Sequence, residues 1–573
     1  MKSLLFAAAV VAVVLWPESL AVEGANLTAQ MQADAGSGGG FRGQFCYTLD
    51  DVYIGWEIVM EFNTDVRGIQ AVDGVLVGGT SGCSRRWVMA NKPYSGIHQS
   101  GFHLCIRMSG SVCGGGTAHA TGTLINLSHD TMQNIPPAPT VAGAQSMKYN
   151  YPEVLQKSIL FYEAQRSGKL PHNNRIPWRG DSAVHDHGAN GEDLTGGWYD
   201  AGDNVKFNFP MAFSTTLLCW GLLEYKEAYS KAGQLDHMYD CIRWPLEYLV
   251  KCHTKPNELY VQVGNGQQDH TQWTSPELMD DNRPAYKVDA SHPGSDVADE
   301  TAAAMACGYL AFKEKVFQRR PIFTRKSIHY ESNNYTDELV WGGLWLHKAT
   351  GENSYLQDAQ ASYEKGPAWG FSWDEKLAGN MVLMCDATHG ALGKDDVVAT
   401  MVAWSPGPDG FGPPFTYTPK CLAWRLQWGA LRYSANTAFV ALLAAKRGLN
   451  KSEYNQWAMC QIHYALGDAG RSFVCGFGKN PPTQPHHRGA SCPVRPAPCN
   501  WEAQQNPGPN PHVLYGALVG GPGNHDDYTD SRMDFTHNEV ACDYNAGFQG
   551  AVAGLLQLAI DHELPDPTSC GHC

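Results

Sequence analysis

The sequence predicts a multidomain fold in which a small all-β sandwich precedes a larger all-α domain. Residues 22–128 are rich in Gly, Thr and Val and contain alternating runs such as 56–62, which are typical of short antiparallel strands. Residues 147–565 instead place apolar side chains at helical spacing. Between them, residues 129–146 are rich in Pro and Ala, which indicates a linker, and residues 566–573 form a short tail that contains cysteine.

The second domain is expected to be helical because its apolar residues recur every three to four positions. Leu155, Ile159 and Tyr162 would share one helical face. Further helices are predicted at 213–229, 236–252, 296–316, 336–349, 431–447, 452–467 and 545–561. Long loops rich in Gly, Pro, Trp and His separate the helices, at 171–212, 262–295, 405–420 and 475–530. Long loops on a rigid scaffold commonly carry function, so we expect the chemistry there.

The net charge of the chain limits which kinds of molecule it is expected to bind. The chain of 573 residues has a formal net charge of −15, which argues against nucleic acid or an anionic membrane as the main partner. A soluble protein with a neutral ligand fits this balance better.

The first residues predict an export signal. Lys2 precedes an apolar run at 4–15, and small residues at Ser19 and Ala21 suit cleavage after Ala21. A membrane anchor is the alternative, but a membrane span needs about 20 apolar residues. We therefore expect residues 1–21 to be removed and the protein to be secreted to the extracellular space.

The cysteine count agrees with export. Most of the 17 cysteines should be paired in an exported chain, and because the count is odd at least one is free or pairs between chains. Cys46, Cys83, Cys105 and Cys113 are expected to close two bridges, and Cys570 and Cys573 are expected to form disulfides of the tail. Glycosylation sequons lie at Asn26, Asn126, Asn334 and Asn450.

The first of three loop segments that gather reactive side chains spans 196–204. Asp200 and Asp203 are separated there by Ala and Gly and flanked by Trp198 and Tyr199, which predicts a tight turn with two carboxylates facing one space. Taken alone, such a turn could equally be one in which Asp binds its own backbone.

The other two segments lie near the C-terminal end. Residues 528–545 carry Glu539 among several acids just before a helix, although acids at a helix start are favourable without any function. Residues 480–488 are rich in Pro and end in His486 and Arg488, which can donate to hydroxyl groups or hold a carboxylate. Zinc binding by the two adjacent His is disfavoured because no acid or Cys lies at ligand spacing.

Together the three segments resemble the signatures of glycoside hydrolase family 9, the cellulase family, in order and spacing over about residues 147–562. Residues 196–204 resemble its Asp-Ala-Gly-Asp loop, and residues 480–488 match its Pro-His-x-Arg signature. The remaining segment matches the family pattern at Tyr528, Asp530, Phe535, Glu539, Ala541, Asn545 and Ala546.

The resemblance implies an (α/α)6 barrel with an open cleft and an endo-β-1,4-glucanase that hydrolyses cellulose or a soluble β-1,4-glucan with inversion. Glu539 would be the general acid, Asp203 the base that activates water, and Asp200 a holder of that water. An inverting pair stands about 6.5–9.5 Å apart, and the acid needs a raised pKa. No cofactor would be required for catalysis, and the protein is expected to be a monomer.

Matching loops extend the implied site along the cleft. The substrate-binding residues that the resemblance implies are His270, Trp273, Trp369, Trp428, Arg432, His486, Arg488 and Tyr544. Flat aromatic faces can stack on the apolar faces of glucose rings. For each Trp the alternative is packing in the core.

Two further resemblances concern binding. Asp337, Glu338 and Asp374 resemble a calcium site of some family members, with the hard oxygen ligands that calcium prefers. Residues 55–62 and 87–96 resemble family 2 carbohydrate-binding modules, with Trp56 at a core position and Tyr94 where a binding Trp is usual. That module could bind cellulose, amorphous glucan, chitin or nothing.

Two other functions stay open. The chain could be a polysaccharide-binding protein that does not cut its ligand, or a hydrolase with another mode of action: an exo-acting enzyme, a mixed-linkage glucanase or a glucosaminidase. The presence of all three carboxylates favours an enzyme, and an open cleft favours cleavage inside the chain.

Overall fold

The structure is a computed structural model. It describes residues 27–570, apart from 36–38, 52, 54, 79–81, 93–97, 99, 128–137, 139, 280–281, 314–333, 406–415 and 495–496. The export signal, Tyr94, Asn26, Cys573 and much of the linker therefore lie outside the described residues. The chain divides into two units, Met1–Asn91 with His98–His129, and Lys92–Ile97 with Asp130–Cys573.

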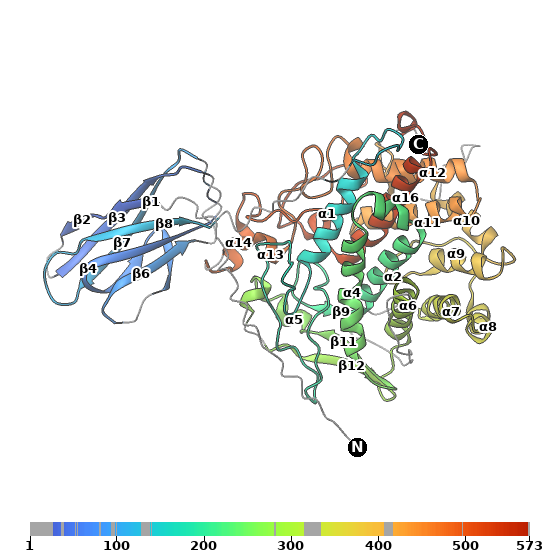
Figure 1. The fold of residues 1–573 in the computed structure, drawn as a ribbon, viewed down its shortest axis with the longest axis horizontal. Coiled ribbons are helices and arrows are strands. Elements are labelled where there is room, and N and C mark those ends of the chain that lie inside the picture. The colour runs from blue at the N-terminus through green and yellow to red at the C-terminus, as the bar shows by residue number, and fades with distance from the viewer. Residues whose placement is uncertain are drawn as a thin grey trace, which may run out of the picture. The chain divides into compact units, whose positions relative to one another are not determined.

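The N-terminal unit is all β. Its strands pair antiparallel in the order β1-β8-β4-β7-β3-β2, with β6 on β4 and β5 on β6 (Figure 1). The strands are β1 Leu27–Gln30, β2 Gln32–Ala35, β3 Gly40–Thr48, β4 Trp56–Ala71, β5 Gly74–Gly78, β6 Ser84–Asn91, β7 His103–Val112 and β8 Ala120–Asn126. The first half of β4 pairs with β6 and β8, and its second half pairs with β7. The long strand thus joins the parts of the sheet around one core.

Alternation along β4 explains that core. Trp56, Ile58, Met60 and Phe62 point inward and are buried, so the predicted packing role of Trp56 is confirmed. The expected two bridges are present, as Cys46–Cys105 between β3 and β7 and as Cys83–Cys113.

The second unit is built mainly of helices. Its helices are α1 Tyr151–Ala164, α2 Asn208–Glu224, α3 Lys226–Lys231, α4 Leu235–Cys252, α5 Gly266–Asp269, α6 Ser295–Phe312, α7 Thr336–Thr350, α8 Asn353–Ser362, α9 Leu377–Ala387, α10 Lys394–Trp404, α11 Ala430–Lys446, α12 Lys451–His463, α13 Arg488–Ser491, α14 Trp501–Gln505, α15 Phe535–Asn538 and α16 Cys542–Ile560. Short strands accompany them: β9 Lys206–Phe207, β10 His253–Lys255, β11 Glu258–Val263, β12 Ala285–Asp289, β13 Thr416–Tyr417 and β14 Ala423–Trp424.

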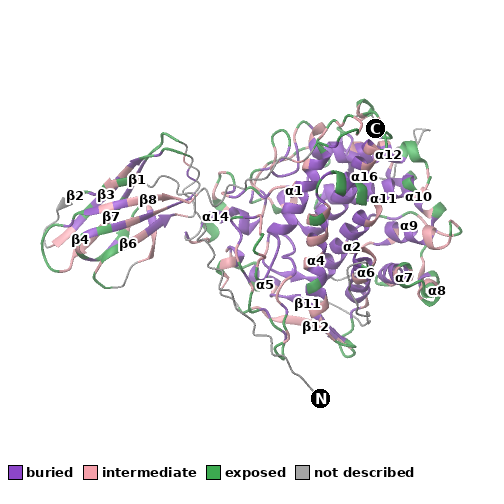
Figure 2. Ribbon diagram, in the orientation of Figure 1, coloured by how far each residue is buried: buried purple, intermediate pink, exposed green. Residues whose placement is uncertain are grey.

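Helix packing closes on itself. Helix α2 packs on α6, and the contacts continue through α7, α9 and α11 to α16, which returns to α2 (Figure 1). Where α2 and α16 cross, Gly221 faces Gly550 and a Cβ on Gly221 would lie 3.2 Å from the Gly550 Cα. The circuit therefore depends on small residues that let two helices approach closely. Figure 2 shows the central helices buried along most of their length.

The structure differs from the predicted helices in three ways. The segment 213–229 is two helices, since α2 begins at Asn208 and ends before α3. The helix expected to end at 467 stops at His463 and continues as a π-helical turn, Tyr464–Asp468. Helices α8, α9 and α10 were not predicted. Helices α2 and α9 carry apolar residues on most sides, so no amphipathic period marks their limits.

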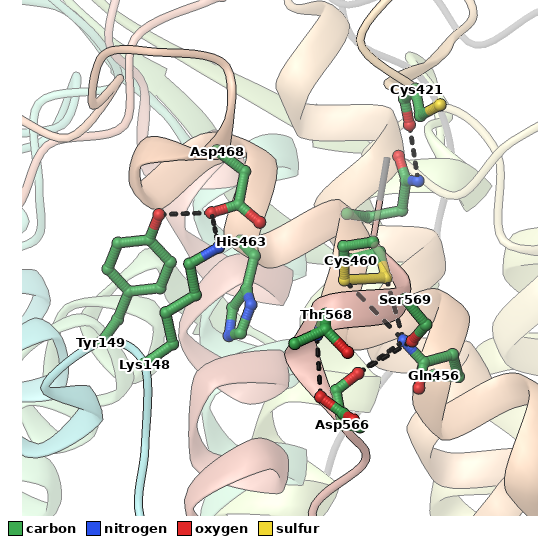
Figure 3. The surroundings of a disulfide bond; sticks show 12 residues. Lys148, Tyr149, Cys421, Gln456, Cys460, His463, Asp468, Asp566, Thr568 and Ser569 are labelled. Carbon is green, nitrogen blue, oxygen red and sulfur yellow. Dashed lines mark hydrogen bonds and ion pairs between the residues drawn. A yellow bond between two sulfur atoms is a disulfide. The ribbon is translucent and has the colours of Figure 1, made fainter. Parts of the chain in front are cut away.

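Both ends of the helical unit are fastened to the same region. Lys148 and Tyr149 bond Asp468 at 2.7 and 2.5 Å, and Cys460 of α12 forms a disulfide with Cys570 (Figure 3). Cys570 thus joins the tail to a helix. These links hold the start and the end of the unit beside α12.

Other cysteines divide into bonded and free. Cys219–Cys307 and Cys492–Cys499 are disulfides, and Cys421 is also bonded. Free thiols among the described residues are those of Cys241, Cys252, Cys385, Cys475 and Cys542. More cysteines are free than the single one that the odd count requires. Within the described residues no helix has the length and apolar character needed to cross a membrane.

Candidate active site

Three loops far apart in the chain meet through their backbones. The amide of Cys542 donates to the Asp200 carbonyl at 2.9 Å, and the amide of Arg488 donates to the Gly202 carbonyl at 2.9 Å. The amide of His486 donates to the Asn538 carbonyl at 2.8 Å, beside Glu539. The three sequence segments singled out above therefore form one site.

Gly202 makes the closest of these approaches possible. A Cβ atom on Gly202 would lie 2.0 Å from the His486 carbonyl oxygen, which no side chain can tolerate. The glycine between Asp200 and Asp203 is thus required by packing against the loop that carries His486 and Arg488.

A small sheet brings a fourth loop beside Asp203. Strand β9 follows Asp203 and pairs with β11, so that Lys206 lies opposite Val263. Directly after β11, helix α5 carries Asp269 and is followed by His270. The His270 Nε2 lies 3.8 Å from an Asp203 carboxylate oxygen.

The Asp203 carboxyl lies in largely buried surroundings, beside the carboxylate of Asp269. Burial and the nearby Asp269 carboxylate raise the pKa of Asp203 to about 7, while Arg488 opposes the rise. Arg488 itself bonds Asp269, and both side chains are buried. The amide of Ala201 donates to Asp203 at 3.3 Å and holds the carboxylate in the turn.

Glu539 is held by two donors. The indole N–H of Trp428 donates to its Oε2 at 2.5 Å, and the Tyr544 hydroxyl donates to the same oxygen at 3.1 Å. Burial raises the pKa of Glu539 above its ordinary value, and the two hydrogen bonds lower it in part. The charge of Glu539 also raises the pKa of Asp203, so the two groups interact across the site.

The arrangement has the parts of an acid–base site. Burial favours the protonated form of one carboxyl, Glu539, and the second, Asp203, lies beside an arginine and a histidine and can accept a proton once ionised. Residues 151–552 match the sequence family described as "Glycosyl hydrolase family 9". The chain belongs to glycosyl hydrolase family 9. It is therefore an enzyme that hydrolyses glycosidic bonds, as predicted.

Named relatives of the family 9 chain are endoglucanases. Endoglucanase B of Cellulomonas fimi is 46% identical over 461 residues, which cover 73% of this chain but 43% of that protein. Endoglucanase A of Bacillus pumilus is 44% identical over 454 residues, covering 73% of this chain and 68% of the relative. The chain thus matches less than half of the first relative and about two thirds of the second.

Solved structures agree with the fold. An endoglucanase from the termite Nasutitermes takasagoensis has a TM-score of 0.67 and 45% identity, and the match covers 72% of this chain and all (100%) of that one. The cellulase Cel9M of C. cellulolyticum, solved with cellobiose, has a TM-score of 0.66 and 31% identity, covering 72% and 99%. The helical unit is an (α/α)6 barrel preceded by a β unit, and the predicted fold class is confirmed.

Four of the predicted substrate-binding residues have side chains that are at least partly exposed to solvent. Trp369 and Trp428 are 41% and 47% exposed, His270 is exposed, and His486 is half-buried. Burial lowers the pKa of His486 to about 4, so its ring is neutral near pH 7. Its Nδ1 donates to the Arg532 carbonyl at 2.7 Å, which leaves Nε2 as an acceptor.

The other four, two aromatic residues and two arginines, are buried. Trp273 is 3% exposed and donates to Ser491 Oγ at 3.0 Å, so most of its surface is packed against protein. Tyr544 is also buried, and its hydroxyl donates a hydrogen bond to Glu539. Arg432 is paired with Asp543 at 2.8 Å, and Arg488 with Asp269. Aromatic type alone did not distinguish exposed rings from buried ones.

Sequence reasoning missed Asp269, a residue of this site that contacts Arg488. Asp269 adjoins His270 in a loop already matched, and its acidic type was the available signal. Phe535, which belongs to the matched family pattern, is 47% exposed, although no role in binding was predicted for it from the sequence.

The proposed calcium ligands lie in a separate buried acidic cluster. The Lys376 ammonium contacts Glu338 at 3.2 Å and Glu300 at 3.3 Å, and all three side chains are fully buried. Asp337 accepts the Lys376 amide at 2.7 Å through Oδ2, whereas its Oδ1 is buried without a hydrogen-bond partner.

The donor set of this cluster suits a hard cation, because buried carboxylate oxygens outnumber the single ammonium. Burial and neighbouring acids raise the pKa of Glu375 to about 7, which reflects this excess of negative charge. Among the described residues, the groups whose ligand atoms lie within 4.8 Å of one another do not include Asp337, Glu338 and Asp374. The three carboxylates would supply only part of a calcium shell.

Proposed function

We propose that this protein is a secreted endo-β-1,4-glucanase that cuts cellulose or a soluble β-1,4-glucan inside the chain with inversion. The observation that carries the proposal is the meeting of the Asp200–Asp203 turn with the loop of Glu539. Endoglucanase relatives at 44% and 46% identity, and the cellobiose in a family 9 neighbour, support a glucan substrate.

Glu539 acts as the general acid in this proposal. Its raised pKa favours the protonated carboxyl, which gives its proton to the glycosidic oxygen as the bond to the anomeric carbon breaks. Trp428 and Tyr544 then donate to the carboxylate that remains, which stabilises the product state of the acid.

Asp203 acts as the base in its ionised form. It takes a proton from water as the water oxygen bonds to the opposite face of the anomeric carbon, which inverts the configuration. Asp200, held by Val205 and Cys542 through its backbone, helps to orient that water. No step in this sequence needs a cofactor.

The direct test measures cleavage and its position in the chain. The full protein is incubated with carboxymethyl-cellulose, and viscosity is followed together with new reducing ends. Endo action predicts a steep fall in viscosity while few reducing ends have formed. An exo-acting enzyme would release reducing ends with little change in viscosity. Retained binding without new ends would favour the polysaccharide-binding alternative.

Further parts of the proposal concern the whole chain. We expect cleavage after Ala21, secretion and a monomer, and the disulfides of both units are consistent with an oxidising compartment. Asp337, Glu338 and Asp374 would help to hold a structural calcium ion. Lower thermal stability after chelation, restored by added calcium, is the expected result, and an unchanged melting temperature would count against the ion.

A further inference from the structure

Aromatic rings form a continuous series that extends past the acid. Trp428 contacts Phe535 with ring centroids 5.3 Å apart, and Phe535 contacts His486 at 6.0 Å. His486 contacts Trp273 at 5.1 Å, and Trp273 contacts Trp501 at 5.8 Å. The series begins at the indole that donates to Glu539 and ends at Trp501, a residue to which no role has been given so far.

Trp501 and Trp273 differ in a way that matters for a ligand. Trp273 is buried, whereas 41% of Trp501 is exposed, so Trp501 is the ring with a free surface at this end of the series. The Trp501 indole N–H donates to the Thr271 carbonyl at 3.3 Å, next to His270. The ring is thereby tied to the same loop that faces Asp203.

The segment that carries Trp501 is firmly braced. The disulfide Cys492–Cys499 closes a short loop just before it, and Asn500 caps helix α14 through the Glu502 amide at 2.9 Å. A rigid ring loses little conformational entropy when a ligand binds on it.

Arg532 connects this segment to the acid loop. It is 1% exposed, and its guanidinium donates to the carbonyls of Ala503, Gln504, Asn506 and Gly508 and to the Asn510 side chain, at 2.6–3.1 Å. The Arg532 carbonyl accepts the His486 ring N–H. One buried arginine therefore fixes the position of the Trp501 segment relative to both His486 and the loop of Glu539.

We propose that Trp501 is an additional sugar-binding platform of the cleft, on which a glucose ring of a longer β-1,4-glucan stacks beyond the residues around Glu539 and Asp203. The inference rests on the proposed function and adds a specificity for chain length. Stacking on an exposed indole uses the apolar face of the sugar and needs no charge, which fits a neutral glucan.

The test compares chain lengths in the full protein. Binding of cellotriose and of cellohexaose is measured by calorimetry in Glu539→Gln, with and without Trp501→Ala. We expect Trp501→Ala to weaken cellohexaose binding about tenfold, equal to ~1.4 kcal/mol, and to leave cellotriose much less affected. Tyr309→Ala, which removes an exposed ring from α6, is the matched control and should change neither.

A second variant and steady-state kinetics distinguish ligand binding by Trp501 from a purely structural role. Trp501→Phe keeps an apolar ring and should retain most of the cellohexaose affinity. With Glu539 intact, Trp501→Ala should raise KM on long chains while kcat on a short chromogenic glucoside stays unchanged.

Two results would overturn the platform. Equal loss of affinity for both oligosaccharides, or no loss for either, would mean that Trp501 only packs over Trp273 and does not bind a sugar. Failure of the parent protein to bind either oligosaccharide would instead refute the proposed function, and the platform with it.

Discussion

Asp203 and Glu539 both have raised pKa values, and the reaction needs them in opposite states. Buried Asp203 must lose its proton although burial and Asp269 resist this, whereas Glu539 must keep its proton although Trp428 and Tyr544 favour the ionised form. Activity is expected at pH values where Asp203 has lost its proton and Glu539 still holds one, and both titrations belong to the coupled pair.

Asp203 and Glu539 are both expected to be needed for turnover. Asp203→Asn and Glu539→Gln should each lower kcat on unactivated glucan by a factor on the order of 10²–10⁴, because each removes one proton transfer and keeps the shape. Steady-state kinetics on carboxymethyl-cellulose measures the loss. Near-normal turnover by either variant would refute the assigned role.

Thermal unfolding of the same variants supplies the control. The folded-state pKa of Asp203 lies above its unfolded value, so ionising it destabilises the fold as pH rises from about 4 to about 7. Asp203→Asn removes that penalty and should melt at an equal or higher temperature at pH 7. A large fall in melting temperature would mean that lost activity reflects lost structure.

The indole N–H of Trp428 is expected to affect the pH at which Glu539 loses its proton. Trp428→Phe removes the N–H that donates to Glu539 and keeps an aromatic ring, so the pKa of Glu539 should rise. The acid then keeps its proton to higher pH, and the alkaline limb of kcat should move up by about one pH unit. A limb that stays in place, or moves down, would show that this hydrogen bond does not tune the acid.

At the scale of elements, the site depends on how closely loops approach. Gly202→Ala would place a methyl group against the His486 carbonyl, where the backbone cannot yield cheaply. We expect a loss of about 3 kcal/mol or more in unfolding free energy, together with most activity.

Denaturant titration measures the effect of Gly202→Ala. Gly114→Ala, where a Cβ meets nothing within 4 Å, is the matched control and should be nearly neutral. Equal behaviour of the two variants would contradict the packing argument.

The elements that could be predicted from the sequence are those with a clear local sequence pattern. The three site segments were identified because Asp203, Glu539 and Arg488 lie in long, specific patterns. Burial was not predictable in the same way, because Trp273 and Trp428 have the same chemistry and differ only in what packs against them. Helix α9 was missed because it is apolar on most sides, and the role of Asp269 depends on its contact with Arg488.

At the scale of the molecule, the helical unit holds the whole candidate site. Gln145 bonds the Leu564 backbone at 2.9 and 3.1 Å, so the unit is closed on itself near both of its ends. A chain that begins at residue 140 should therefore fold and cut soluble glucan with unchanged kcat. A steep loss on soluble substrate would show that the N-terminal unit contributes to catalysis.

Single displacement by Asp203 and Glu539 determines the stereochemistry of the first product. Proton NMR during early turnover of a soluble cello-oligosaccharide resolves the anomers before they interconvert. We expect the α-anomer to form first from the β-linked substrate. First formation of the β-anomer would require a covalent intermediate and would contradict the role given to Asp203.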